Sequence, residues 1–246
     1  MGGWIQRKIP MKIKILKYVA EQGLVCVSDV ERHLGMKRKT NSIRVTMRQL
    51  GLRCLRFGVI KYGVWFVEDR KLFKLLKSYY PNMRDMKPGC WFPYKVYHCL
   101  GMNEIRYLME NTKAYRIFNW QSEYVLRAMP MLIRAGFGKV KFPDATFQRR
   151  LSDTDIGTYF LEYERSSKYK VRYERIFKFY AKRPDTGRQN VIYVCEDGGI
   201  VQKLKDMETD MARRGLIQKD RHFRFLTIDQ IRQTYQEQGG ENHEDT

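Results

Sequence analysis

FPD at residues 142–144 and YFLEYE at residues 159–164 are the two stretches that decide the fold we expect, because each ends an apolar run with acidic residues. Successive side chains of a strand point to opposite faces, so Glu162 and Glu164 should project from the same face. If the strand of Asp144 pairs beside them, three carboxylates meet at one end of a sheet. Carboxylates at such short distances repel each other unless a cation lies among them. Their oxygen atoms are suitable ligands for a divalent metal ion. The alternative interpretation is that all three are solvent-facing positions on half-buried strands.

Charge is distributed unevenly along the 246 residues, whose formal net charge is +20. Residues 1–90 hold 20 Lys and Arg but only 6 Asp and Glu, so most of the surplus lies in the first third of the chain. A surplus of this size predicts a polyanionic partner, most often a nucleic acid. Binding to a membrane surface is the competing interpretation, but residues 1–6 lack the Ser or Thr of a myristoylation signal.

The five cysteines form no CxxC pair, so a zinc site is not expected. Most of them lie in apolar surroundings and are predicted to be reduced, buried thiols. The sequence shows no signal peptide and no apolar run long enough to cross a membrane. We therefore expect a cytoplasmic protein without a membrane partner.

Residues 1–86 show the element order of a winged helix-turn-helix domain. The predicted elements are helices at residues 11–22, 29–34 and 38–50, a hairpin of strands at residues 52–57 and 64–67, and a further helix at residues 69–79. Ser28 and Glu31 are spaced as a capping box at the start of the second helix. In such a domain the third helix enters the major groove of double-stranded DNA and the hairpin touches the backbone. The alternative is a solvated basic face on a helical domain that binds protein.

The third helix separates into an apolar stripe, which includes Ile43 and Met47, and a polar, basic stripe. The predicted DNA-binding residues lie on that basic stripe, at its N-terminal end and in the hairpin loop: Lys37, Arg38, Lys39, Asn41, Arg44, Arg48 and Lys61. Arg can read guanine and Asn can read adenine through paired hydrogen bonds, which makes Asn41, Arg44 and Arg48 the predicted base readers. The lysines are better suited to phosphate contacts.

The rest of the chain predicts an α/β domain at residues 94–235, joined by a linker at residues 87–93 and followed by a disordered acidic tail at residues 236–246. The predicted helices cover residues 94–111, 170–182 and 200–214, a partly helical segment covers residues 119–129, and strands cover residues 142–144, 158–164, 191–195 and 222–228, with others expected within residues 131–142. This order predicts a mixed sheet covered by helices. The positions of its carboxylates resemble the layout of the PD-(D/E)xK nuclease core, in which a metal ion activates the attacking water.

Several short motifs in this order, behind a winged helix, resemble the replication-relaxation family of plasmids and other mobile elements. They are HCLGMNE at residues 98–104, WQSE at residues 120–123, PD at residues 143–144 and FLEYE at residues 160–164, followed by a helix that ends in Tyr180. The resemblance covers about residues 11–182. It implies a DNA-binding protein that acts in replication, transfer or DNA relaxation and carries a nuclease-like domain.

The resemblance also implies a set of site residues. The catalytic candidates are Glu123, Asp144, Glu162, Glu164 and Lys170, and the metal candidates are Asp144, Glu162 and Glu123, with Mg²⁺ or Mn²⁺ as the cofactor. The nuclease motif ends in Glu-x-Lys, but Glu164 occupies the place of that lysine, so a neighbouring cation would have to replace it. Lys168, Lys170, Arg172 and Arg175 are the neighbouring candidates. His98 and Trp120 match the same motifs, and we expect structural roles for both.

The sequence leaves two functions open. The chain is either a metal-dependent DNA endonuclease or nickase of a mobile element, or a non-catalytic DNA-binding regulator of transcription or replication with a degenerate nuclease-like domain. No GxSxG motif suggests a serine nucleophile, and the 4 scattered histidines do not form the metal cluster of a tyrosine relaxase. The expected partners are double-stranded DNA, replication or mobilisation proteins, and a second copy of the chain in a homodimer.

Overall fold

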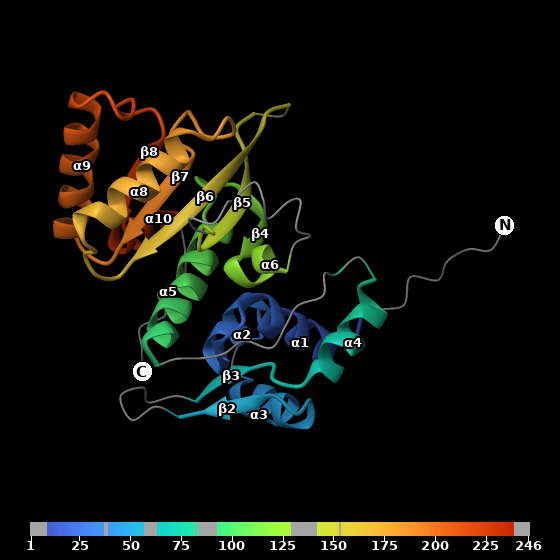
Figure 1. Ribbon diagram of the computed structural model, residues 1–246. Helices are drawn as coiled ribbons and strands as arrows, with labels where there is room; N and C mark the ends of the chain where they lie inside the picture. Colours follow the sequence, from blue (N-terminus) through green and yellow to red (C-terminus); the bar gives the residue numbers. More distant parts are fainter. Residues whose placement is uncertain are drawn as a thin grey trace. The chain divides into compact units, whose positions relative to one another are not determined.

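The computed structural model describes residues 9–36, 39–56, 63–81, 83, 93–128, 142–152 and 154–238. Its helices and strands form a mixed α/β structure with two sheets in this described part (Figure 1). Two compact units divide the chain, unit 1 at Met1–Asn103 and unit 2 at Glu104–Thr246, and their boundary falls inside helix α5 (Pro93–Glu110). None of the described helices is both long and apolar enough to span a bilayer.

Unit 1 begins with helices and continues with a short antiparallel sheet. Its elements are α1 (Met11–Gln22), β1 (Val25–Cys26), α2 (Val27–His33), α3 (Thr40–Gln49), β2 (Arg53–Leu55), β3 (Val64–Phe66) and α4 (Arg70–Tyr79). The strands pair in the order β1-β3-β2. Gly23, with a φ of 78°, ends α1 in a conformation that favours glycine. The predicted helices and both hairpin strands form within a few residues of their expected bounds.

The start of α2 differs from the prediction. Cys26, not Ser28, precedes the helix, and its backbone N–H donates to the Asp29 carboxylate at 2.9 Å. Glu31, the predicted capping residue, instead accepts the backbone N–H of Lys39 at 3.0 Å, directly before α3. Glu31 therefore links α2 to the start of α3 and helps to fix the turn between the two helices.

Unit 2 is built around a mixed sheet. After α5 come β4 (Ile117–Ser122), α6 (Glu123–Arg127), β5 (Ala145–Arg150), β6 (Ile156–Glu164), α8 (Lys170–Ala181), β7 (Val191–Cys195), α9 (Gly198–Arg213), β8 (Phe223–Thr227) and α10 (Ile228–Glu237). The strand order is β4-β5-β6-β7-β8. β4, β5 and β6 pair antiparallel, whereas β7 and β8 join in parallel. The parallel pairs require crossover connections, which α8 and α9 provide.

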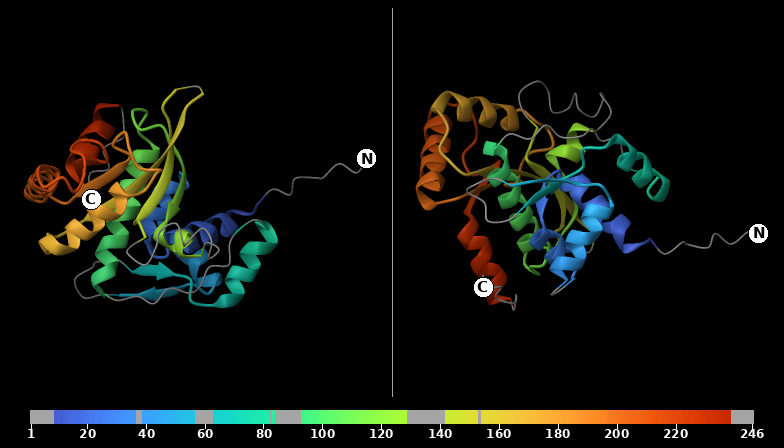
Figure 2. Two further views of the ribbon diagram at one scale, coloured as in Figure 1. Left: turned by 45° about the horizontal axis from the view of Figure 1, so that its top comes forward. Right: turned by 90° about the horizontal axis from the view of Figure 1, so that it is seen from below.

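The main core of unit 2 lies between the sheet and the pair α8 and α9, which lie next to each other (Figures 1 and 2). Alternate residues of the strands, such as Phe160 and Tyr193, pack there against Phe177 of α8 and Leu204 of α9. The intervening strand residues, such as Ile192, are also buried. The centre of the sheet is therefore covered on both faces, which explains why its strands read as nearly continuous apolar runs.

The structure contains two strands, β4 and β5, that were not predicted. The segment at residues 119–129 is partly helical, as predicted, since α6 begins at Glu123, but its first residues, including Trp120, belong to β4. Asp144 was expected to end a strand, but it directly precedes β5, whose six residues had not been predicted. Both strands contain aromatic or β-branched residues, which favour an extended conformation.

The chain also continues as a helix where a disordered tail had been expected from residue 236 on. Thr227 and Gln230 form a capping box at the start of α10, and the helix extends to Glu237. That spacing is a sequence signature of a helix N-terminus. Residues 239–246, most of the predicted strands within residues 131–142, and the predicted linker apart from Pro93 lie outside the described residues.

Candidate functional site

Glu162 and Glu164 lie at the end of β6 and are both buried, with 0% and 1% of their surface exposed. They lie in register with Tyr193 and Cys195 of β7, on the face of the sheet that packs against α8 and α9. The alternative interpretation of solvent-facing carboxylates is therefore wrong. A buried carboxylate needs hydrogen bonds or a cation, because an isolated charge away from water is costly.

Hydrogen bonds to Leu161 and Tyr163, the two chain neighbours of Glu162, fix Asp144 beside that glutamate. Its backbone N–H donates to the Leu161 carbonyl at 3.0 Å, and its carboxylate accepts the Tyr163 backbone N–H at 2.8 Å. Asp144 thus extends the ladder between β5 and β6 by one residue. Its own carbonyl accepts the Glu123 backbone N–H at 2.8 Å, which attaches the start of α6 to the same place.

Two side chains beyond β6 bind the buried glutamates. The Tyr180 hydroxyl of α8 donates to Glu162 Oε1 at 2.6 Å, and the Lys168 ammonium pairs with Glu164 Oε1. The backbone N–H of Lys168 also donates to the Tyr173 hydroxyl at 3.1 Å. Burial and the Glu162 carboxylate together hold the pKa of Tyr180 well above its ordinary value. Tyr180 therefore stays a neutral hydrogen-bond donor.

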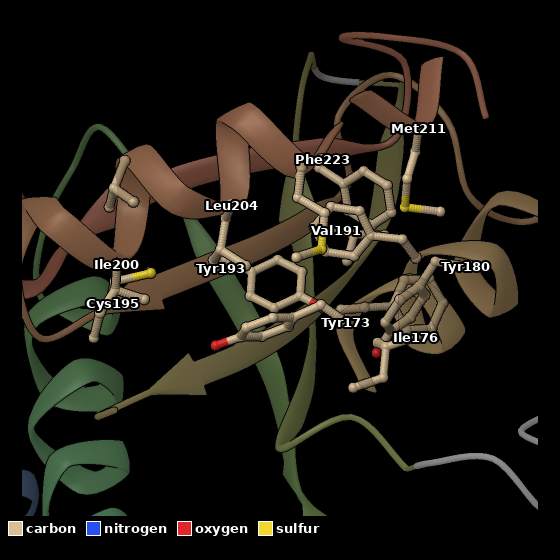
Figure 3. Packing of buried hydrophobic residues seen from close by; sticks show 14 of the residues in the cluster. Tyr173, Ile176, Tyr180, Val191, Tyr193, Cys195, Ile200, Leu204, Met211 and Phe223 are labelled. Atoms are coloured by element: carbon tan, nitrogen blue, oxygen red, sulfur yellow. The ribbon is translucent and has the colours of Figure 1, made fainter. Parts of the chain in front are cut away.

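Tyr193 belongs to the same hydrophobic core cluster as Tyr173 and Tyr180 (Figure 3). It is fully buried, and its hydroxyl finds no hydrogen-bond partner among the described residues. Burial raises the pKa of Tyr193 well above its ordinary value, and the nearby Glu162 and Glu164 raise it further. A buried hydroxyl without a partner costs free energy and calls for an explanation, such as a bound water, ion or ligand.

The other two predicted catalytic residues, Glu123 and Lys170, form ion pairs with residues outside this cluster. The carboxylate of Glu123 pairs with Arg127, one turn along α6, with an Nε–Oε1 distance of 2.8 Å. The Lys170 ammonium is exposed and binds Asp210 of α9 at 3.2 Å, so Lys168 is the lysine that contacts the buried acids. Among the described residues, no group of three His, Cys, Asp or Glu side chains is arranged to hold a metal ion.

The basic stripe of α3 is accessible in unit 1. Ile43 and Met47 are buried, whereas Asn41 and Arg48 are exposed and Arg44 is half-buried. Lys39 is also exposed, just before the helix. The remaining predicted DNA contacts, Lys37, Arg38 and Lys61, lie outside the described residues.

Arg56 was not among the predicted DNA-binding residues, but it adds a further cation near the basic stripe of α3. It follows β2 and is exposed. The positive charges of Arg56, Arg48 and Arg44 each act to lower the pKa of the Cys54 thiol, although burial raises that pKa overall. These three arginines therefore lie near Cys54 of β2. No carboxylate of the described residues lies within ion-pair distance of them. The alternation of Cys54 and Arg56 along a strand beside a basic helix could have revealed this from the sequence.

Trp120 belongs to a row of aromatic rings that crosses the sheet of unit 2. Its ring stacks on Phe147 at a centroid distance of 5.8 Å, and Phe147 stacks on Tyr159 at 5.5 Å. This packing agrees with the structural role expected for Trp120. His98 is half-buried within α5.

Comparisons with protein-family models, with curated proteins and with solved structures found no match for this chain. Two places in the structure can therefore indicate the function of this chain. One is the basic face of unit 1, which we define as Lys39, Asn41, Arg44, Arg48 and Arg56. The other is the buried acidic cluster of unit 2, which we define as Asp144, Glu162, Glu164, Lys168 and Tyr193.

Proposed function

We propose that this chain is a DNA-binding protein that binds double-stranded DNA through unit 1. In this proposal, unit 1 is a winged helix-turn-helix, α3 lies in the major groove, and β2 and β3 are the strands of the wing. The order of helices, followed by an antiparallel hairpin, supports it. So does the resemblance of the chain to the replication-relaxation family, which implies a role in the replication, transfer or relaxation of a plasmid or other mobile element.

The observation that carries the proposal is the concentration of cations on the basic face without neutralising carboxylates. Arg44, Arg48 and Arg56 all lie near Cys54 and have no acidic partner among the described residues. Unpaired cations repel each other when they are close together. Keeping them together therefore costs the fold free energy unless an anion binds there. Phosphates of a DNA backbone supply that anion, and releasing their counterions favours the complex.

Binding of a labelled DNA duplex, measured by fluorescence anisotropy at several salt concentrations, tests this proposal. The double variant Arg44→Ala, Arg48→Ala should lose specific binding, since each good arginine–base pair contributes about 1–3 kcal/mol. The matched control removes the same charge from unit 2 through Arg150→Ala and Arg188→Ala. Equal binding by the two double variants would contradict the proposal.

For unit 2 we propose a nuclease-like fold whose functional centre is the buried acidic cluster. The helix α5, the antiparallel strands β4 to β6, and α8 followed by the parallel strand β7 support this assignment. Asp144, directly before β5, and Glu162 of the neighbouring β6 offer the hard oxygen ligands that Mg²⁺ or Mn²⁺ prefers. The Tyr193 hydroxyl, which has no partner among the described residues, favours a ligand nearby. A metal ion bound there would lower the pKa of a water for attack on a phosphodiester. Lys168, which pairs with Glu164, would supply a cation beside the cluster.

A regulator with a degenerate nuclease-like unit is the second candidate function, favoured by the absence of a three-residue metal group among the described side chains. Nicking of supercoiled plasmid, with Mn²⁺ or with EDTA, separates the two. Metal-dependent nicking that Glu162→Gln abolishes would make the protein an endonuclease. If the wild type binds duplex DNA without nicking it, the function lies in DNA binding by unit 1. The partners of such a regulator would be replication or mobilisation proteins and a second copy of the chain.

A further inference from the structure

Tyr169 and Val171 are far more exposed than the other large apolar side chains of the described residues, at 89% and 77%. The next most exposed apolar residue, Ile156, reaches only 50%. Both residues lie where the loop after β6 enters α8. An exposed tyrosine ring has lost the apolar contacts that usually stabilise it, so an aromatic side chain this exposed suggests a partner.

The backbone beneath this tyrosine ring is fixed. Tyr169 is the N-cap residue of α8, with a φ of −64° and a ψ of 144°. Its carbonyl accepts the backbone N–H of Arg172 at 3.0 Å. On the other side, Lys168 is held by its ion pair with the buried Glu164. The ring is therefore presented from a supported position, which reduces the entropy lost when a ligand stacks on it.

The surroundings of the ring are cationic. The segment RSSKYKVR at residues 165–172 contains four Lys or Arg and no acid. Lys203 of α9 adds another cation, since its ammonium donates to the Ser167 hydroxyl and, at 3.3 Å, to the Lys168 carbonyl. Arg172 is exposed and has no carboxylate partner among the described residues, whereas Lys170 is paired with Asp210. A flat, anionic polymer fits such a surface.

We propose that residues 165–172, together with Lys203, form a binding surface for single-stranded DNA, in which an unstacked base lies on the Tyr169 ring. Aromatic side chains set among cations are the common device of single-strand binding, because every base has a π-face and every nucleotide a phosphate. A duplex does not fit, since its base faces are covered by their neighbours. Val171 supplies apolar contact to the base or sugar, and Arg172 and Lys203 bind phosphates.

This inference rests on the proposed function of the chain as a DNA-binding protein, and it extends that function to unit 2. In this proposal the bound single-stranded DNA lies near the carboxyl end of β6. There the ion pair of Lys168 connects the binding surface to Glu164 of the buried acidic cluster. Unit 2 would either act on the single-stranded DNA held there as its substrate or protect it.

The test uses the full chain and a fluorescent 12-nucleotide single strand of mixed sequence, beside a duplex of the same sequence. Tyr169→Ala should weaken single-strand binding about 5- to 150-fold, because stacking contributes about 1–3 kcal/mol per base. Tyr169→Phe keeps the ring and should bind like the wild type. Leu151→Ala, which removes another exposed apolar side chain of unit 2, is the matched control and should change nothing. Duplex binding should be unaffected by all three changes.

The outcomes separate this inference from the proposed function. Unchanged single-strand binding by Tyr169→Ala, or equal weakening in Tyr169→Phe, would overturn the stacking surface while leaving duplex binding by unit 1 intact. Duplex binding lost in Arg44→Ala, Arg48→Ala, together with single-strand binding lost in Tyr169→Ala, would support both. A wild-type chain that bound neither DNA would overturn the proposed function and the inference together.

Discussion

The Tyr180 hydroxyl donates a 2.6 Å hydrogen bond to Glu162 Oε1 in the interior of unit 2, where neither side chain is exposed to solvent. This contact joins α8 to the strand that carries the acidic cluster. A hydrogen bond between a hydroxyl and a carboxylate is short and strong, and it positions both groups. Tyr180 is therefore a positioning residue for Glu162, whatever chemistry the cluster supports.

We expect Tyr180→Phe to lower the free energy of unfolding by about 1.5–3 kcal/mol, because the buried Glu162 carboxylate loses a donor that water cannot replace. Tyr193→Phe is the matched control, since it removes a hydroxyl of the same core that has no described hydrogen-bond partner. That variant should unfold at the same urea concentration as the wild type or at a higher one. Equal destabilisation of the two variants in urea unfolding would contradict the assigned hydrogen bond.

A second prediction concerns Glu208, a buried residue of α9. Burial raises the pKa of its carboxyl to about 7, although the Asp220 backbone N–H, which donates to it at 3.1 Å, opposes the shift. A carboxyl whose pKa is higher in the folded state stabilises the fold below its unfolded pKa, and this contribution is lost as the pH rises toward 7. The loss is at most about 3.5 kcal/mol, since the pKa rises from 4.5 to about 7 and one pKa unit corresponds to about 1.4 kcal/mol.

Glu208→Gln keeps the acceptor for Asp220 and removes the ionisation. Urea unfolding at pH 5 and pH 8 should show that this variant loses less stability than the wild type over that interval. Other titrating groups, such as His222, are present in both proteins and cancel in the comparison. The same pH dependence in both proteins would show that Glu208 is not the group responsible.

Much of this fold follows from local sequence signals, as α3 and β7 illustrate. The two faces of α3 were predictable because Ile43 and Met47 recur one helical turn apart, and VIYVC at residues 191–195 could only be a buried strand. The alternation of Glu162 and Glu164 also predicted that they share a face. Their burial was not predictable, since it depends on α8 folding back over the sheet and on Tyr180 supplying a donor 18 residues later.

The candidate site shows the same limit of sequence reasoning. Lys170 was the predicted catalytic lysine and Lys168 one of its neighbouring alternatives, because spacing alone does not say which one bends back toward β6. In the structure, Lys168 lies in the loop and reaches Glu164, whereas Lys170 is already the first residue of α8 and points to Asp210. The unpartnered hydroxyl of Tyr193 could not have been found from sequence either, since it depends on packing from several elements.

A third prediction uses Cys54 as a reporter of the basic face. Its thiol is only half-buried, and three arginines oppose the rise in its pKa, whereas burial above all raises the pKa values of Cys26 and Cys195 to about 12. Reaction rate follows the thiolate fraction, so iodoacetamide at pH 8 should label Cys54 before Cys26 and Cys195. Mass spectrometry of peptides reads each cysteine separately.

Bound duplex DNA should then slow the labelling of Cys54, because it covers the face formed with Arg44, Arg48 and Arg56. Cys195 lies in the core of unit 2, and its slow reaction should not change when DNA is added. If duplex DNA bound the protein without slowing the labelling of Cys54, the DNA would have to lie elsewhere.

The fourth prediction compares the two lysines that spacing could not distinguish. Lys168→Met should lower the free energy of unfolding by about 3 kcal/mol, because it leaves the buried Glu164 carboxylate without its cation. Lys170→Met removes an exposed pair with Asp210 and should cost less than about 1 kcal/mol. Both changes replace an ammonium by a side chain of similar length, so each serves as the control for the other in parallel urea titrations. Nicking, if the wild type shows it, should fall only in Lys168→Met. A larger loss of stability in Lys170→Met would mean that the cation beside the acidic cluster is Lys170, as the sequence had suggested.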